Sequence, residues 1–168
     1  KPRQWQQQLI QLLRRRLQSE PRGGQDVLVF AGPGAGKTLG ALLAFSRMRQ
    51  ESHLQRVVVF CHRTSILEQW DRAAARLNLT LATWPCPQET VSAADGVLLT
   101  YQAAGRQPQL LETALRDWAP ETLLAIADEA HHLGLDPDDP SAAAWGQTFQ
   151  ELTAGCRLRL GLTGTPFR

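Results

Sequence analysis

Two carboxylates and two imidazoles lie within five positions of the chain, directly after an apolar run. They are Asp128, Glu129, His131 and His132, in the segment AIADEAHHLG. Side chains of these types can ligate a transition metal, act as general acid and base, or hold the Mg²⁺ of a nucleotide. The spacing is compatible with all three chemistries, so the choice depends on what else the chain supplies.

A glycine-rich segment earlier in the chain predicts a phosphate-binding loop. Residues 31–38 read AGPGAGKT and fit the G-x-x-x-x-G-K-[ST] pattern, except that alanine stands first. Glycines let the backbone curl so that its N–H groups surround phosphate oxygens, and the helix expected from Lys37 points its positive end at them. A plain flexible turn is the alternative, but the flanking apolar strand and helix favour the phosphate loop. The residues expected to bind nucleotide here are Gly34, Ala35, Gly36, Lys37 and Thr38.

The lysine and the acid pair acquire definite roles beside such a loop. Lys37 is one of two lysines among eighteen basic residues, and its compact ammonium suits the β and γ phosphates better than arginine's broad fork. Thr38 and Asp128 are expected to hold Mg²⁺ from opposite sides, and Glu129 to orient or deprotonate the attacking water. A zinc site is disfavoured, because H-E-x-x-H is absent and an extended chain would point Asp128 and Glu129 to opposite faces. His132 is interpreted as a polar residue at a helix start.

Short apolar runs alternate with helical patterns along the chain. Strands are expected at 26–31, 56–61, 96–101, 122–127 and 158–163, and helices at 4–18, 37 to about 50, 65–78, 107–118 and 141–154. Continuously apolar strands that alternate with helices predict an α/β fold with a mainly parallel sheet covered on both faces. Ligands of such sheets bind at the carboxyl ends of the strands, where both polar motifs stand. Residues 1–168 are expected to form a single domain.

The composition, 43% hydrophobic and 20% charged, predicts an ordinary soluble globular domain. No apolar run approaches the roughly 18 residues that a membrane span requires. Three separated cysteines indicate a reducing compartment, the cytoplasm. The net charge of +2 divides unevenly, because residues 1–63 carry eleven Lys/Arg and three Asp/Glu, whereas residues 64–168 carry seven and thirteen. This asymmetry slightly favours a polyanionic partner.

Together the motifs resemble the first RecA-like lobe of a superfamily 2 DEAH-box helicase or translocase, a P-loop NTPase with a three-layer αβα sandwich. AGPGAGKT is similar to motif I, DEAH to motif II, VVVFCHRTSILEQW to motif Ia, LLTYQ to motif Ib and LGLTGTPFR to motif III. PRQWQQQ is similar to the glutamine motif that precedes motif I in some relatives. DEAHH and TGTPFR look most like the restriction-subunit and repair-translocase branch.

This resemblance assigns further roles by position. It implies that the side chain of Gln6 hydrogen-bonds the adenine base. It also implies that three residues of motifs II and III report the γ-phosphate to a nucleic-acid groove: His131, Thr163 and Thr165. Contacts with the sugar–phosphate backbone are implied for three residues of motifs Ia and Ib: Arg63, Thr100 and Tyr101.

The function implied by the resemblance is an ATP-driven motor lobe that uses ATP and Mg²⁺ and acts on nucleic acid, with duplex DNA favoured over RNA. A second RecA-like lobe is an expected partner, and a membrane is not. Residues 1–168 alone are expected to hydrolyse ATP very slowly and to unwind nothing. Two other classes stay open: a nucleotide-dependent switch that binds nucleic acid or protein without unwinding, and a phosphate-loop enzyme such as a small-molecule kinase.

Overall fold

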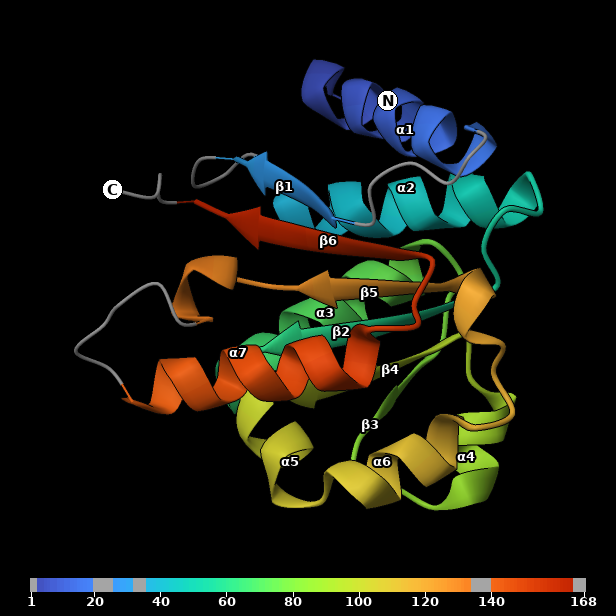
Figure 1. Cartoon of the computed structure of the whole chain (residues 1–168). Helices are drawn as coiled ribbons and strands as arrows, with labels where there is room; N and C mark the ends of the chain where they lie inside the picture. Colours follow the sequence, from blue (N-terminus) through green and yellow to red (C-terminus); the bar gives the residue numbers. More distant parts are fainter. Residues whose placement is uncertain (1–2, 20–25, 32–35, 134–139, 165–168) are drawn as a thin grey trace.

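The computed structural model describes residues 3–19, 26–31, 36–133 and 140–164. The described strands form one six-stranded sheet (Figure 1). They are β1 (Asp26–Phe30), β2 (Arg56–Cys61), β3 (Leu81–Thr83), β4 (Gly96–Thr100), β5 (Leu123–Ala127) and β6 (Leu158–Thr163). Their order is β1-β6-β5-β2-β4-β3, and every neighbouring pair is parallel. The α/β fold with a parallel sheet, predicted from the sequence, is confirmed.

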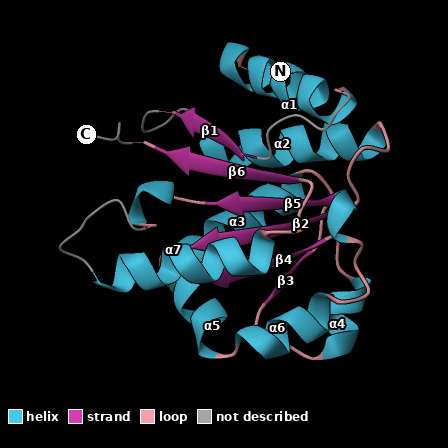
Figure 2. Ribbon diagram, in the orientation of Figure 1, coloured by secondary structure: helices cyan, strands magenta, loops and turns pink. Residues whose placement is uncertain are grey.

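Helices cover both faces of this sheet (Figure 2). One face carries α1 (Gln4–Gln18), α2 (Lys37–Gln50) and α3 (Thr64–Arg76). The other carries α4 (Gln88–Ala93), α5 (Tyr101–Arg106), α6 (Pro108–Leu115) and α7 (Pro140–Thr153). Two short 3₁₀ helices, η1 (Pro120–Thr122) and η2 (Ala130–His132), flank β5. Within the described segments, no helix is both long enough and apolar enough to cross a bilayer.

Alternate residues of the central strands belong to two separate hydrophobic cores, one on each face of the sheet. Val57 and Val59 of β2 pack beneath α1, α2 and α3, whereas Val58 and Phe60 pack beneath the helices of the other face. Every residue of β4 and β5 is buried. Burial on both faces therefore explains why these strands are apolar throughout and show no alternation of polarity.

Some elements differ from the sequence-based expectation. The edge strand β3 has three residues and α4 has six, and neither was predicted. The helix expected at 107–118 corresponds to α6, whereas α5, which directly follows β4, was not predicted. The hydroxyl of Thr100 accepts a hydrogen bond from the amide of Ala103 (3.0 Å) and caps α5. The strand expected to reach Tyr101 therefore ends one residue earlier.

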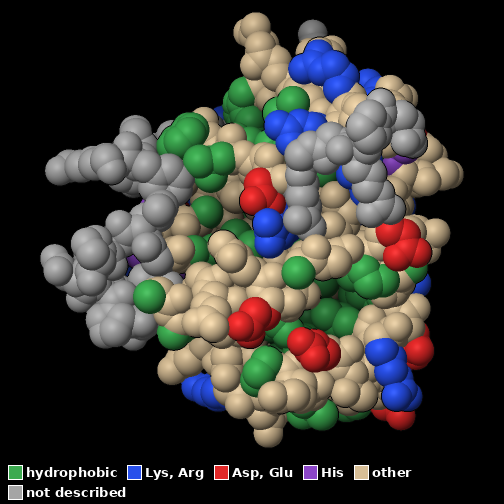
Figure 3. Space-filling view, in the orientation of Figure 1, with side chains coloured by type: hydrophobic (Ala, Val, Ile, Leu, Met, Phe, Trp, Pro, Cys, Tyr) green, Lys and Arg blue, Asp and Glu red, His purple; other side chains and the backbone are tan. Residues whose placement is uncertain are grey.

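The helices α1 and α2 run parallel to each other along one side of the sheet. Near the start of both helices, the Gln6 side chain in α1 donates a hydrogen bond to the carbonyl of Gly36, just before α2 (3.2 Å). Near their ends, Arg14 of α1 forms an ion pair with Glu51, just after α2 (2.7 Å). Basic side chains lie over α1 in Figure 3. The last turn of α1 carries Arg15 and Arg16, and the last turn of α2 carries Arg47 and Arg49, about 15–18 Å along the helix from Lys37. Much of the positive excess of the N-terminal half thus lies far from the polar motifs.

The close contact between α1 and α2 depends on the buried residue Gly40. A Cβ atom there would lie 2.6 Å from Cη2 of Trp5 and 2.9 Å from Cγ of Gln6.

We expect Gly40→Ala to push α1 outward and to lower the free energy of unfolding by about 1–3 kcal/mol, as measured by urea unfolding. The matched control is Gly105→Ala, because a Cβ at that helical glycine meets no atom within 4 Å. That control should gain about 0.5–1 kcal/mol. Equal stability of the Gly40→Ala protein and the wild type would contradict the packing described.

Candidate nucleotide site at the carboxyl edge of the sheet

The two polar motifs meet at the carboxyl edge of the sheet. Lys37 begins α2, which follows β1, while Asp128 and Glu129 directly follow β5. The ammonium of Lys37 makes an ion pair with the carboxylate of Glu129 and lies 3.4 Å from Oδ1 of Asp128. Fold topology thus brings together the charged residues that the sequence singled out. The three side chains are called the acid–lysine cluster below.

A left-handed turn places both carboxylates on the same ammonium. β5 ends at Ala127, and Glu129 has φ 49° and ψ 54°. The Glu129 amide donates a hydrogen bond to Oδ1 of Asp128 (2.9 Å), which fixes the turn. The expectation that the two acids point to opposite faces assumed an extended chain, and it is wrong for this turn. A non-glycine residue in this region costs about 1–3 kcal/mol, and such strain concentrates at functional sites.

The carboxylate of Asp128 is deeply buried but well supplied with donors. The residue Asp128 is only 2% exposed. Oδ2 accepts a hydrogen bond from the indole N–H of Trp70 (2.9 Å), and the backbone carbonyl accepts one from the hydroxyl of Tyr101 (2.9 Å). These donors and the nearby ammonium of Lys37 replace the water that burial removes. The contact with Trp70 was not predicted from the sequence, because it joins residues 58 positions apart.

The acid–lysine cluster carries a formal charge of −1, which favours an additional cation. Burial alone would raise the pKa of Glu129. The hydrogen bond and the charge of Lys37, with the charge of His131, outweigh burial and hold that pKa below its usual value. Glu129 is therefore ionised at neutral pH. A carboxylate with a lowered pKa is better suited to orient a water molecule than to take a proton from it.

The residues present fit Mg²⁺ bound with a polyphosphate. Asp128 and Glu129 provide carboxylate oxygens, and Thr38 carries a hydroxyl in the first turn of α2, where the helix dipole favours anions. Oxygen ligands of this kind suit Mg²⁺, which keeps several waters and shares the phosphates of its substrate. In the described parts of the chain, no group of three or more His, Cys, Asp and Glu side chains is placed to hold a metal by itself.

His131 links the acid–lysine cluster to the end of β6. Its Nδ1 lies 2.8 Å from Oγ1 of Thr163 and 3.3 Å from Oε2 of Glu129. Thr163 is fully buried. Two of the residues expected to couple motifs II and III are thus in contact, whereas Thr165 lies outside the described residues.

A stack of imidazoles connects η2 to the end of β2. The rings of His62 and His132 are 4.6 Å apart between centroids. Burial lowers the pKa of His62, and the charges of His132 and Arg63 lower it further. His62 is therefore neutral at neutral pH. Arg63, beside it, is exposed at the N-cap of α3, as contact with a polyanion would require.

Gln6 ties α1 to the end of the glycine-rich loop. It is 4% exposed, and its amide accepts a hydrogen bond from the Arg3 N–H (3.0 Å) and donates one to the Gly36 carbonyl (3.2 Å). Gly36 has φ 71°, a conformation that favours glycine. An adenine would have to use the second N–H and the second lone pair of the Gln6 amide. Gly34 and Ala35 lie outside the described residues.

Thr100 and Tyr101 face the interior. Thr100 caps α5, and Tyr101 is 1% exposed. The phenol ring stacks with Phe60 (6.0 Å between centroids) and with Trp145 (5.8 Å). Burial and the charge of Asp128 raise the pKa of Tyr101. The nucleic-acid contact predicted for these two side chains is not offered by this conformation.

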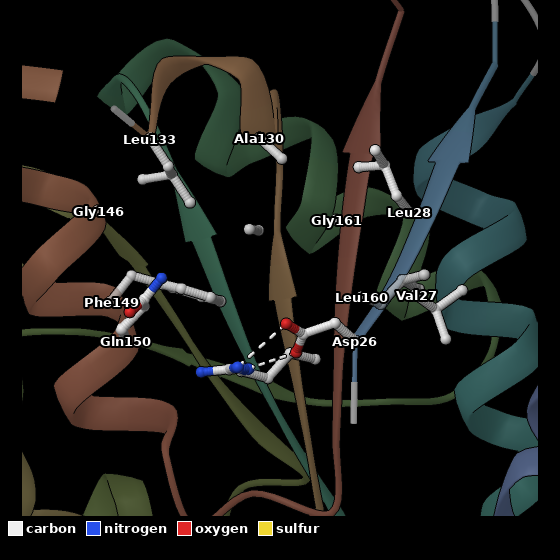
Figure 4. A pocket seen from close by; sticks show the side chains of 12 residues that line it. Asp26, Val27, Leu28, Ala130, Leu133, Gly146, Phe149, Gln150, Leu160 and Gly161 are labelled. Carbon is white, nitrogen blue, oxygen red and sulfur yellow. Dashed lines mark hydrogen bonds and ion pairs between the residues drawn. The ribbon is translucent and has the colours of Figure 1, made fainter. Parts of the chain in front are cut away.

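An apolar cavity of about 340 Å³ borders the turn that carries the two acids, since Ala127 and Ala130 are among its lining residues (Figure 4). It opens between α7 and the strands β1 and β6, and its lining includes Leu28, Leu133 and Phe149. Asp26 and Arg159 form an ion pair in its wall (2.6 Å). None of the three residues of the acid–lysine cluster lines the cavity.

Curated relatives are similar over most of the chain. The uncharacterized protein ML1624 of Mycobacterium leprae (strain TN) is 34% identical over 157 residues, which cover 90% of this chain and 24% of that protein. The uncharacterized protein Rv2917 of Mycobacterium tuberculosis (strain ATCC 25618 / H37Rv) is 32% identical over 154 residues, with the same coverage of 90% and 24%. The chain therefore spans about a quarter of the length of the curated relatives it matches.

Solved ATPase and helicase cores share the fold. The Sulfolobus solfataricus SWI2/SNF2 ATPase core in complex with dsDNA has a TM-score of 0.71 and 22% identity, over 99% of this chain and 32% of that one. The UvsW helicase from bacteriophage T4 has a TM-score of 0.66 and 15% identity, over 98% and 53%. The Type ISP restriction-modification enzyme LlaGI, in complex with a DNA substrate mimic, has a TM-score of 0.69 and 17% identity, over 99% and 18%.

At these identities the likeness to solved structures shows the fold alone, a RecA-like α/β lobe. The family assignment comes from the sequence. The family described as "Type III restriction enzyme, res subunit" matches residues 1–168, the whole of the chain. The chain therefore belongs to the Type III restriction enzyme res subunit family.

Proposed function

We propose that residues 1–168 form the ATP-binding lobe of an ATP-dependent helicase or translocase of the DEAH type, with DNA favoured over RNA as its track. The observation that carries this proposal is the meeting of Lys37, Asp128 and Glu129 at the carboxyl edge of the sheet. Membership of a restriction-subunit family supports it. The DNA bound in two of the structures with this fold supports the preference for DNA.

In this mechanism the phosphates of ATP lie on the glycine-rich loop, a Walker A loop, at the positive end of α2. Lys37 turns from the carboxylates to the β and γ oxygens. Asp128 and Thr38 would hold Mg²⁺, and the ion would supply positive charge to the phosphates. Glu129, ionised because Lys37 and His131 lower its pKa, orients the attacking water in line with the γ-phosphate.

The ends of β2 and β6 are the proposed route from the γ-phosphate to nucleic acid. His131 contacts both Glu129 and Thr163, so a change at the acids reaches the end of β6. Thr165 extends this route, and Arg63 contacts the sugar–phosphate backbone. Gln6 contributes the contact with adenine. A second RecA-like lobe closes over the same edge and supplies the remaining charge for the transition state, so the isolated lobe is nearly inactive.

The role of the acid–lysine cluster is tested by Glu129→Gln and Lys37→Ala in the full-length protein. Glu129→Gln should keep ATP binding and lower hydrolysis by about 10²–10⁴-fold, because the amide no longer orients the water. Lys37→Ala should weaken ATP binding itself.

The control is Glu121→Gln, an exposed acid in η1 at the opposite edge. Phosphate release, with and without duplex DNA, and calorimetric ATP titration measure the two effects. Turnover retained by Glu129→Gln would remove it from the mechanism.

The nucleic-acid contact is tested by Arg63→Ala. Loss of one phosphate contact should weaken DNA binding about equally for different sequences and lower the salt slope by about one. Fluorescence anisotropy of labelled duplex DNA at several salt concentrations measures both quantities. Arg47→Ala is the control, since this exposed arginine lies in the last turn of α2. Identical slopes for Arg63→Ala and the wild type would exclude the contact.

A further inference from the structure

We propose that Trp70 and Tyr101 are positioning residues, which hold Asp128 from opposite faces of the sheet and connect it to α3 and α5. The proposal rests on the proposed function, because it assumes that Asp128 binds Mg²⁺. Trp70 belongs to the core beneath α1, α2 and α3, and Tyr101 to the core of the opposite face. Asp128 lies between them at the edge of the sheet.

Trp70 fixes the plane of the Asp128 carboxylate. Its indole N–H donates to Oδ2 at 2.9 Å, while Oδ1 accepts a hydrogen bond from the Glu129 amide at 2.9 Å. Each oxygen therefore has a donor on a different side, and the group cannot rotate without losing one bond. Trp70 is completely buried, so water does not replace its N–H. Hydrogen bonds to metal-binding groups tune the affinity of the metal site.

Tyr101 fixes the backbone of the same residue. The Asp128 amide donates to the carbonyl of Phe60 (2.8 Å), which continues the ladder with β2. Its carbonyl turns away from that ladder and accepts the hydrogen bond of the Tyr101 hydroxyl (2.9 Å). Amide, carbonyl and carboxylate of Asp128 are thus all held by described neighbours.

The two bonds lead to helices that begin at the edge proposed to face nucleic acid. α3 begins beside the exposed Arg63, and α5 begins at Tyr101 itself, capped by Thr100. A shift of either helix on binding nucleic acid would move a hydrogen-bond donor of Asp128. The same aromatic rings also fill the core, so the test must separate the polar atom from the ring.

Phenylalanine substitutions remove the polar atom and keep an aromatic ring. We would compare Trp70→Phe and Tyr101→Phe with the control Trp118→Phe in the full-length protein. Trp118 is a buried tryptophan at the amino edge of the sheet, where its ring lies 5.5 Å from the Arg56 guanidinium. Three quantities are measured: binding of a fluorescent ATP analogue against Mg²⁺ concentration, its binding without Mg²⁺, and the ATPase rate with and without duplex DNA.

We expect Trp70→Phe to raise the Mg²⁺ concentration for half-maximal nucleotide binding by about 10–100-fold, with metal-free nucleotide binding unchanged. Tyr101→Phe should reduce the stimulation of the ATPase by DNA. Trp118→Phe should change neither quantity. Wild-type Mg²⁺ dependence in Trp70→Phe, or the same shift in Trp118→Phe, would overturn the proposal while leaving the proposed function intact.

A wild-type protein whose nucleotide binding does not depend on Mg²⁺ would overturn the proposed function and, with it, this inference. If Trp70→Phe does not fold, 3-benzothienylalanine at position 70 replaces the indole N–H by sulfur and keeps the shape of the ring. The same shift in Mg²⁺ dependence is expected there, and its absence overturns the proposal.

Discussion

The ion pair between Lys37 and the two acids after β5 is the interaction on which the rest of the candidate site depends. Two carboxylates next to each other in a partly buried place repel, and each loses hydration. The shared ammonium and the surrounding donors make that arrangement stable. Because one ammonium does not balance two carboxylates, the cluster keeps one negative charge. This remaining negative charge would attract a divalent cation.

The parallel sheet places the carboxyl ends of its strands at one edge. β6 lies between β1 and β5. Lys37 follows β1, Asp128 follows β5, and Thr163 is the last residue of β6. The close approach of α1 at Gly40 then places Gln6 against the last glycine of the loop. The same strands pack on both faces against the buried sides of the helices.

Much of this arrangement could be predicted from the sequence, because it follows from patterns of residues that are close together in the chain. The apolar runs predicted five of the six described strands, and the two motifs predicted that Lys37 and the acid pair lie at the same edge of the sheet. What could not be predicted depends on tertiary contacts. The left-handed turn at Glu129 could not be predicted, because the residue with positive φ is not a glycine. The bond from Trp70 joins residues 58 positions apart.

The same limit applies to the roles predicted for single residues. Tyr101 matches the position of a nucleic-acid contact in the motif, but whether its side chain points outward depends on where α5 begins. That start is decided by the Thr100 cap, so the phenol turns inward to Asp128. Gln6 likewise matches its motif, and only the packed structure reveals that part of its amide is used by Arg3 and Gly36.

We propose that the acid–lysine cluster binds a nucleotide together with its cation. Calorimetric titration of ATP into the protein, with Mg²⁺ and then with EDTA in its place, tests it most directly. We expect saturable binding with Mg²⁺ and markedly weaker binding with EDTA, because the negative cluster repels the bare triphosphate. Equal affinity under the two conditions, or no binding in either, would contradict it.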